Sequence, residues 1–132
     1  MIGIDTNILI RYVLRDDLVQ ASKASRLIES LSEERPGYIT LITVAELFWV
    51  LDRSYKLTRI QFAFVLHSLI DSMTLSFEKE DILSEALDMF SHSNSADFSD
   101  CLITRCCIAN SCESIFTFDR TAAKAAGMTL LS

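Results

Sequence analysis

The stretch Met1-Ile-Gly-Ile-Asp-Thr-Asn-Ile-Leu-Ile-Arg-Tyr12 decides the fold. Residues 2–4 predict a short buried strand and residues 7–15 a helix, so Asp5 falls where the strand turns into the helix and Thr6 can cap that helix. In open parallel α/β sheets, ligands bind at this junction, outside the carboxyl ends of the strands. Helix capping explains an isolated Asp-Thr equally well, so the role of Asp5 depends on acids further along the chain.

The rest of the chain alternates short strands with helices. Strands are expected at 38–39, 74–77, 115–118 and 129–131, and helices at 18–31, 43–55 (beginning at Thr40 or Thr43), 58–73, 81–90, 98–109 and 121–126. The helix at 58–73 is apolar almost all round, which indicates a central helix or a subunit interface. We expect one α/β domain over residues 1–132, a three-layer sandwich whose mainly parallel sheet of four to five strands is flanked by helices.

Composition excludes several classes of protein. No apolar run approaches the roughly 18 residues of a membrane span, and the N-terminus does not resemble a signal peptide, so we expect a soluble cytoplasmic protein. The net charge of −6 has the wrong sign for holding nucleic acid by simple electrostatics. The spacing of Cys101, Cys106, Cys107 and Cys112 matches no zinc or iron–sulfur pattern, and we expect reduced structural thiols.

Three further acids occupy positions from which a parallel fold could return them to Asp5. Asp119 ends the strand at 115–118, as Asp5 ends the first strand. Glu46 lies on an apolar helix, where a capping box with Thr43 is the competing explanation. Asp100 lies one turn into a helix, and Asp97, three residues earlier, is either the cap of that helix or a further member of the set.

Clustered carboxylates are the ligands that Mg²⁺ and Mn²⁺ prefer, and a pair of such ions activates water for attack on a phosphodiester. No positioned His, Lys or Ser rivals these acids as a nucleophile. Thr6, Asn7, Ser99 and Thr117 are polar neighbours that can orient the carboxylates or a metal-bound water. Because such carboxylates repel one another, we expect a raised pKa for at least one of them in the metal-free protein.

Four segments together resemble the PIN-domain family, and most closely the VapC-type toxins of bacterial toxin–antitoxin pairs. They are Ile-Asp-Thr-Asn-Ile-Leu-Ile-Arg-Tyr at 4–12, Thr-Val-Ala-Glu-Leu at 43–47, Ala-Asp-Phe-Ser-Asp-Cys-Leu-Ile at 96–103 and Phe-Thr-Phe-Asp-Arg at 116–120. The family's metal site matches Asp5, Glu46, Asp100 and Asp119 here, and Asp97 matches an acid that only some members carry. The cysteines after Asp100 depart from the usual Ala-rich segment.

The resemblance implies a Mg²⁺- or Mn²⁺-dependent ribonuclease acting on a structured RNA, inhibited by a cognate antitoxin and assembled as a homodimer. It makes Arg11, Arg15, Trp49, Tyr55 and Arg120 candidate groove residues. The main alternative is a catalytically silent PIN-like module that only binds a partner. A Mg²⁺-dependent phosphatase of the haloacid-dehalogenase kind needs a second Asp at position 7, which is Asn7, and a receiver domain needs an acid after the third strand, which ends in Phe77.

Overall fold

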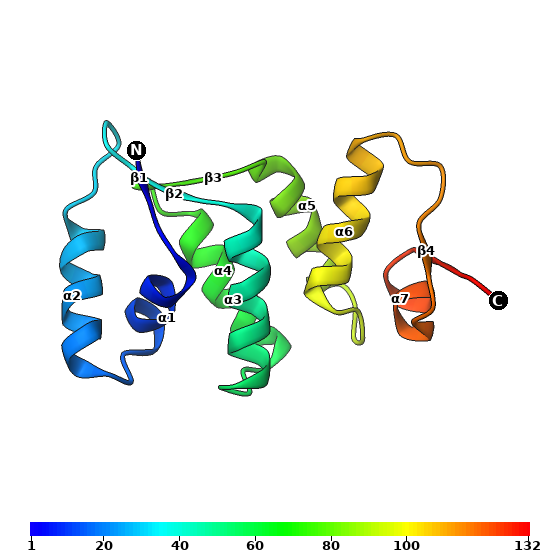
Figure 1. Ribbon diagram of the computed structural model, residues 1–132, viewed down its shortest axis with the longest axis horizontal. Helices are drawn as coiled ribbons and strands as arrows, with labels where there is room; N and C mark the ends of the chain where they lie inside the picture. The colour runs from blue at the N-terminus through cyan, green and yellow to red at the C-terminus, as the bar shows by residue number, and fades with distance from the viewer. The chain divides into compact units, whose positions relative to one another are not determined.

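The computed structural model describes residues 1–132, which divide into two compact units, Met1–Glu78 and Lys79–Ser132 (Figure 1). Each unit combines helices with parallel strands. The first unit contains β1 (Ile2–Gly3), α1 (Thr6–Leu14), α2 (Leu18–Glu29), β2 (Gly37–Ile39), α3 (Leu41–Arg53), α4 (Arg59–Ile70) and β3 (Leu75–Phe77). The second contains α5 (Glu80–Ser91), α6 (Phe98–Ala109), β4 (Phe116–Thr117), α7 (Arg120–Ala125) and β5 (Thr129–Leu130).

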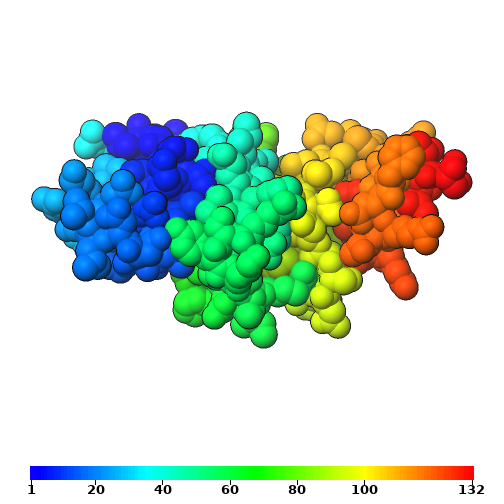
Figure 2. All heavy atoms as spheres, turned by 60° about the horizontal axis from the view of Figure 1, so that its bottom comes forward, coloured from blue at the N-terminus to red at the C-terminus, as the bar shows by residue number.

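The first unit is built on a three-stranded parallel sheet in the order β1-β2-β3. Gly37 in β2 lies opposite Ile2 on one side and Leu75 on the other. Helix α1 packs against both α2 and α3, and the residues of α1 and α2 form one continuous surface in Figure 2 (blue). Apolar side chains from the sheet and from every helix of this unit fill the core, among them Ile39, Leu9, Leu47, Leu51 and Leu66. Burial of these side chains is the main stabilising term.

Polar side chains define where the helices of this unit begin. The Asp17 carboxylate accepts the backbone N–H of Gln20 and so caps the start of α2. Thr58 and Gln61 form a capping box at the start of α4. Helix α4 buries one side and leaves Ile60 and Phe64 exposed, at 84% and 73%. Of the two explanations for this apolar helix, the exposed side favours an interface.

The second unit is organised by the packing of α5 on α6. The rings of Phe90 and Phe98 meet edge to face, with centroids 5.7 Å apart, and Arg105 pairs with Glu85 at 2.9 Å. Strands β4 and β5 pair in parallel around the short helix α7. Gly127, with φ of +74°, follows the C-cap of α7 in the left-handed conformation that ends many helices.

The α/β class with parallel strands is confirmed, and the number of strands agrees with the prediction. The strands hydrogen-bond as a sheet of three and a sheet of two, where the sequence predicts a single sheet. Strands of two or three residues make few ladder hydrogen bonds, and their apolar pattern identifies a strand without identifying its neighbour.

Gly37→Ala tests how tightly the first sheet packs. A Cβ at position 37 would lie 2.9 Å from Leu31 Cδ1 and 3.0 Å from both Ile4 Cγ1 and Leu75 Cδ2, all buried. We expect a loss of about 1–3 kcal/mol in the free energy of unfolding, measured by urea denaturation. Gly3→Ala is the matched control, because its Cβ would meet nothing within 4 Å; it should change stability by less than about 1 kcal/mol. Equal stability of the two variants would contradict this account of the core.

Candidate functional site

Asp5 stands between β1 and α1 at the position where helix caps are found. Its backbone is extended, with φ of −82° and ψ of 161°, but its exposed carboxylate accepts no hydrogen bond from the helix. The prediction that Thr6 caps α1 is wrong, because Thr6 is the first residue inside the helix. Its buried hydroxyl instead donates to Glu46 Oε1 at 3.0 Å. Helix capping therefore accounts for neither side chain.

Glu46 is also not explained by capping. The N-cap of α3 is Thr40, whose hydroxyl accepts the N–H of Thr43 at 3.1 Å, so Thr43 lies within the first turn and Glu46 beyond it. The competing capping box of Thr43 with Glu46 is absent. Thr6 is the residue next to Asp5. Its hydrogen bond therefore holds the Glu46 carboxylate beside the start of α1. The first unit thus brings its two acids to the same helix start.

The second unit places its three acids within electrostatic reach of one another. Asp97 Oδ1 caps α6 through the N–H of Ser99 at 2.8 Å, and Asp119 Oδ1 caps α7 through the N–H of Ala122 at 2.9 Å. Asp100 lies in the first turn of α6. Partial burial raises the pKa of Asp100, and the negative charges of Asp97 and Asp119 raise it further. The expected raised pKa is confirmed, and its causes place the three carboxylates within electrostatic reach of one another.

The ion pairs Arg11–Asp16, His92–Asp88 and Arg105–Glu85 include no member of the acid set. Within either unit, no three Asp, Glu, His or Cys side chains lie close enough to hold one metal ion. Beside Asp100, the buried Ser99 hydroxyl has no hydrogen-bond partner. Hard carboxylate oxygens with an unsatisfied hydroxyl beside them are a donor set that fits Mg²⁺ or Mn²⁺.

The other polar side chains predicted near the acids are placed as follows. The Thr117 hydroxyl accepts the N–H of Asp119 at 3.0 Å, so it shapes the turn that presents that acid. Asn7 is exposed in the first turn of α1. Arg120, the first residue of α7, is exposed directly after Asp119.

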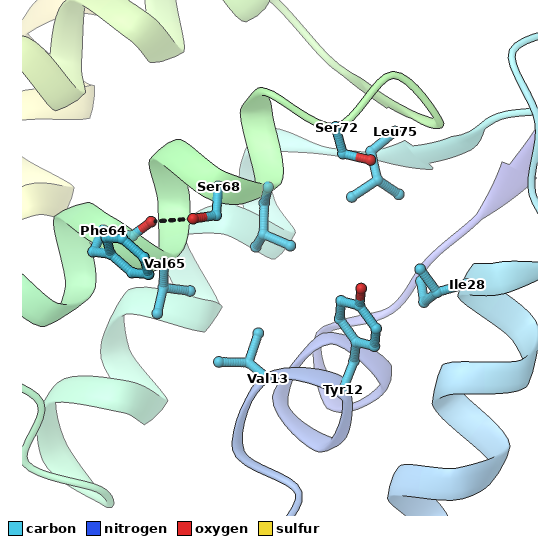
Figure 3. A pocket seen from close by; sticks show the side chains of 9 residues that line it. Tyr12, Val13, Ile28, Phe64, Val65, Ser68, Ser72 and Leu75 are labelled. Atoms are coloured by element: carbon cyan, nitrogen blue, oxygen red, sulfur yellow. Dashed lines mark hydrogen bonds between the residues drawn. The ribbon is translucent and has the colours of Figure 1, made fainter.

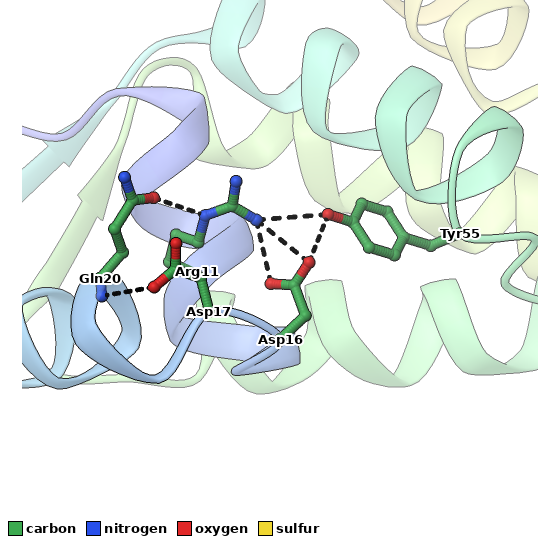
Figure 4. Close-up of polar contacts among 5 residues, drawn as sticks. All are labelled: Arg11, Asp16, Asp17, Gln20 and Tyr55. Atoms are coloured by element: carbon green, nitrogen blue, oxygen red, sulfur yellow. Dashed lines mark hydrogen bonds and ion pairs between the residues drawn. The ribbon is translucent and has the colours of Figure 1, made fainter.

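Arg11 and Tyr55 join the ends of α1 and α3 through a shared carboxylate (Figure 4). Arg11 Nη1 donates to Asp16 Oδ1 at 2.9 Å, and the Tyr55 hydroxyl donates to Asp16 Oδ2 at 2.8 Å. The Tyr55 hydrogen bond and the Arg11 charge hold the pKa of Asp16 below its usual value. Arg15 donates to Ser25 Oγ at 2.6 Å. Arg11 and Arg15 are therefore both engaged within the first unit.

Trp49 lies one turn after Glu46 on α3 and is 45% exposed. The guanidinium of Arg53 stacks on its ring, 3.5 Å from the centroid. Trp49 and Glu46, with Ile42, Ala45 and Val50, line an open hollow of about 490 Å³. The sequence interpretation missed Arg53, although an Arg four residues after an aromatic residue on a helix is a recognisable pairing.

A second hollow, of about 300 Å³, lies among α1, α2 and α4 (Figure 3). Apolar side chains dominate its lining, and the hydroxyl of Tyr12 points into it. Its lining residues are Tyr12, Val13, Ile28, Phe64, Val65, Ser68, Leu69, Ser72 and Leu75. A concave surface that is mostly apolar with a few hydroxyls is typical of a binding site.

These observations define an α/β protein in which acids follow the short parallel strands and stand at helix starts. The family model for the PIN domain matches residues 2–128, and the chain therefore belongs to the PIN-domain family. PIN domains are generally nucleases that need a divalent metal ion. A comparison with curated proteins found no significant match. No helix combines the length and the apolar character needed to cross a membrane.

Asp100→Asn in the metal-free protein tests the repulsion among the acids. A carboxyl group whose pKa is raised on folding lowers stability above that pKa, and this effect disappears as the pH falls and the group is protonated in both states. We therefore expect Asp100→Asn to be as stable as the wild type or more stable at pH 7 with a chelator, with the difference shrinking on acidification. Thermal and urea melts across this pH range measure it.

Glu113→Gln is the control, because this exposed acid lies outside the cluster and should change stability by less than about 0.5 kcal/mol. If Asp100 only stabilises the start of α6, Asp100→Asn should instead cost about 0.3–1 kcal/mol at pH 7. That loss would contradict the repulsion.

Proposed function

We propose that this PIN domain is a Mg²⁺- or Mn²⁺-dependent ribonuclease in which Asp5, Glu46, Asp100 and Asp119 hold the metal, with Asp97 as an additional ligand. The observation that carries the proposal is the pKa of Asp100, which partial burial raises and which the charges of Asp97 and Asp119 raise further. The family match over residues 2–128 supports treating residues 1–132 as one PIN domain.

A bound divalent ion supplies a Lewis acid that makes water nucleophilic at neutral pH and stabilises the charge on the leaving oxygen. The chain's own residues position the ligands. The Thr6 hydroxyl fixes the orientation of Glu46, and the N–H groups of Ser99 and Ala122 each hold one oxygen of Asp97 and Asp119. The other oxygen of each capping carboxylate stays available to a cation. Arg11, Arg15 and Arg120 are proposed to contact the RNA backbone.

We also propose that the protein is the toxin of a toxin–antitoxin pair, that it acts on RNA in the cytoplasm, and that it forms a homodimer. Two features support binding of other chains: the exposed Ile60 and Phe64 on α4, and the apolar hollow around Tyr12. A net charge of −6 favours a partner with a basic segment, as an inhibitory antitoxin tail would present.

Substitutions of the acids and of Thr6 distinguish the proposed metal ligands from the residue that orients one of them, Glu46. We expect Asp5→Asn and Glu46→Gln to lower Mn²⁺-dependent RNA cleavage by more than about 100-fold, since they remove a proposed ligand. Thr6→Val keeps the side-chain shape but loses the hydrogen bond to Glu46, and should lower cleavage by about 10- to 100-fold. Cleavage rates of a structured RNA, with Mn²⁺ and with a chelator, measure both effects.

Glu113→Gln should cleave at the wild-type rate. Expression of the wild-type protein should arrest growth in the absence of an antitoxin, whereas Asp5→Asn should not. Cleavage that survives the chelator, or equal growth arrest by wild type and Asp5→Asn, would overturn the nuclease proposal. A folded wild-type protein with no cleavage at all would instead favour a silent binding module.

A further inference from the structure

Helix α6 ends in a backbone motif that brings two cysteines together. Its C-cap is Asn110, and the next residue, Ser111, adopts the left-handed conformation with φ of +61°. The N–H of Ser111 bonds to Ile108 O at 3.0 Å, and the N–H of Cys112 reaches back to Cys107 O, also at 3.0 Å. These are the two hydrogen bonds of the Schellman motif, in which the side chains at the positions of Cys107 and Cys112 characteristically touch.

The backbone hydrogen bond from Cys112 to Cys107 limits how far apart the Cα atoms of these two residues can be. Standard peptide dimensions place the two Cα atoms within about 7 Å of one another. That distance is within the range that a disulfide can bridge without backbone movement. Partial burial raises the pKa of the Cys107 thiol, and the neighbouring Cys112 thiol raises it further.

The two cysteines differ in their access to solvent. Cys112 is exposed, whereas Cys107 is half-buried and Cys101 is fully buried. Cys106 is half-buried and precedes Cys107 on the helix, so its side chain points about 100° away around the helix axis. The exposed thiol therefore meets a reagent first, with the half-buried Cys107 thiol directly behind it.

We propose that Cys107 and Cys112 are an oxidation site, where a low-molecular-weight disulfide such as oxidised glutathione forms a reversible intramolecular disulfide. The Cys112 thiolate attacks the reagent, forms a mixed disulfide and releases one thiolate. The Cys107 thiolate then attacks the Cys112 sulfur and displaces the second thiolate. Both cysteines lose their protons, and the two electrons they give up reduce the reagent to two thiols.

The disulfide would join the end of α6 to the segment that leads into β4. Helix α6 carries Asp97 and Asp100 in its first turn, and β4 leads directly to Asp119. Oxidation would therefore add a covalent constraint to the connection between these acids. The site does not depend on the proposed nuclease activity, because its geometry lies wholly in the backbone and thiols of residues 107–112.

The experiment treats the full-length protein with oxidised glutathione, traps the remaining thiols with an alkylating agent in denaturant, and measures the intact mass. The wild type should fall from four alkylated thiols to two, and its mass without the alkyl groups should be about 2 Da lower, the mass of two hydrogens; dithiothreitol should restore all four thiols. Cys106→Ser, the matched control, should fall from three thiols to one. Cys107→Ser should stop at the mixed disulfide on Cys112, and Cys112→Ser should form no intramolecular disulfide.

Cys112 is exposed, so the Cys112→Ser result does not depend on repacking of the core. Three outcomes would overturn the proposal. They are an intramolecular disulfide in Cys107→Ser or Cys112→Ser at the wild-type rate, its loss in Cys106→Ser, or a wild type that yields only mixed disulfides or intermolecular dimers.

Discussion

Repulsion among the carboxylates of Asp97, Asp100 and Asp119 is the constraint on which the second unit depends. Asp97, Asp100 and Asp119 lie within electrostatic reach of one another, and the raised pKa of Asp100 reports the cost of ionising it there. The fold tolerates this cost because backbone N–H groups hold Asp97 and Asp119 in place. A cation bound to such a cluster would relieve the repulsion, so carboxylates that weaken the metal-free fold would favour binding of a metal ion.

Capping and metal binding are compatible roles for the same carboxylate. Asp97 and Asp119 each use Oδ1 for a helix N–H, and a carboxylate has two oxygens with about four lone-pair sites in total. The cap therefore fixes the rotation of the side chain and leaves the second oxygen for another ligand. Asp5 and Asp100, which accept no cap hydrogen bond, depend on their place at a helix start or in its first turn for orientation.

The sequence predicted the alternation of strands and helices, because this depends on local patterns. It misplaced the cap of α1, where Asp5 and Thr6 stand next to each other, and it left the start of α3 open between Thr40 and Thr43, of which Thr40 is the cap. The hydrogen bond from Thr6 to Glu46, 40 residues later in the chain, shows that the Thr6 hydroxyl orients this carboxylate and does not cap α1. The division of the strands into two sheets was also missed, as was the pairing of Cys107 with Cys112, which follows from one left-handed residue, Ser111.

The central proposal is that Asp5, Glu46, Asp100 and Asp119 are ligands of a divalent metal ion. Titration of the full-length protein with Mn²⁺, followed by NMR, tests it directly, because the paramagnetic ion broadens the amide signals of nearby residues. We expect the amides next to Asp5 and Glu46 to broaden together with those next to Asp100 and Asp119, with a common midpoint. Broadening confined to one unit, or separate midpoints for the two, would contradict it.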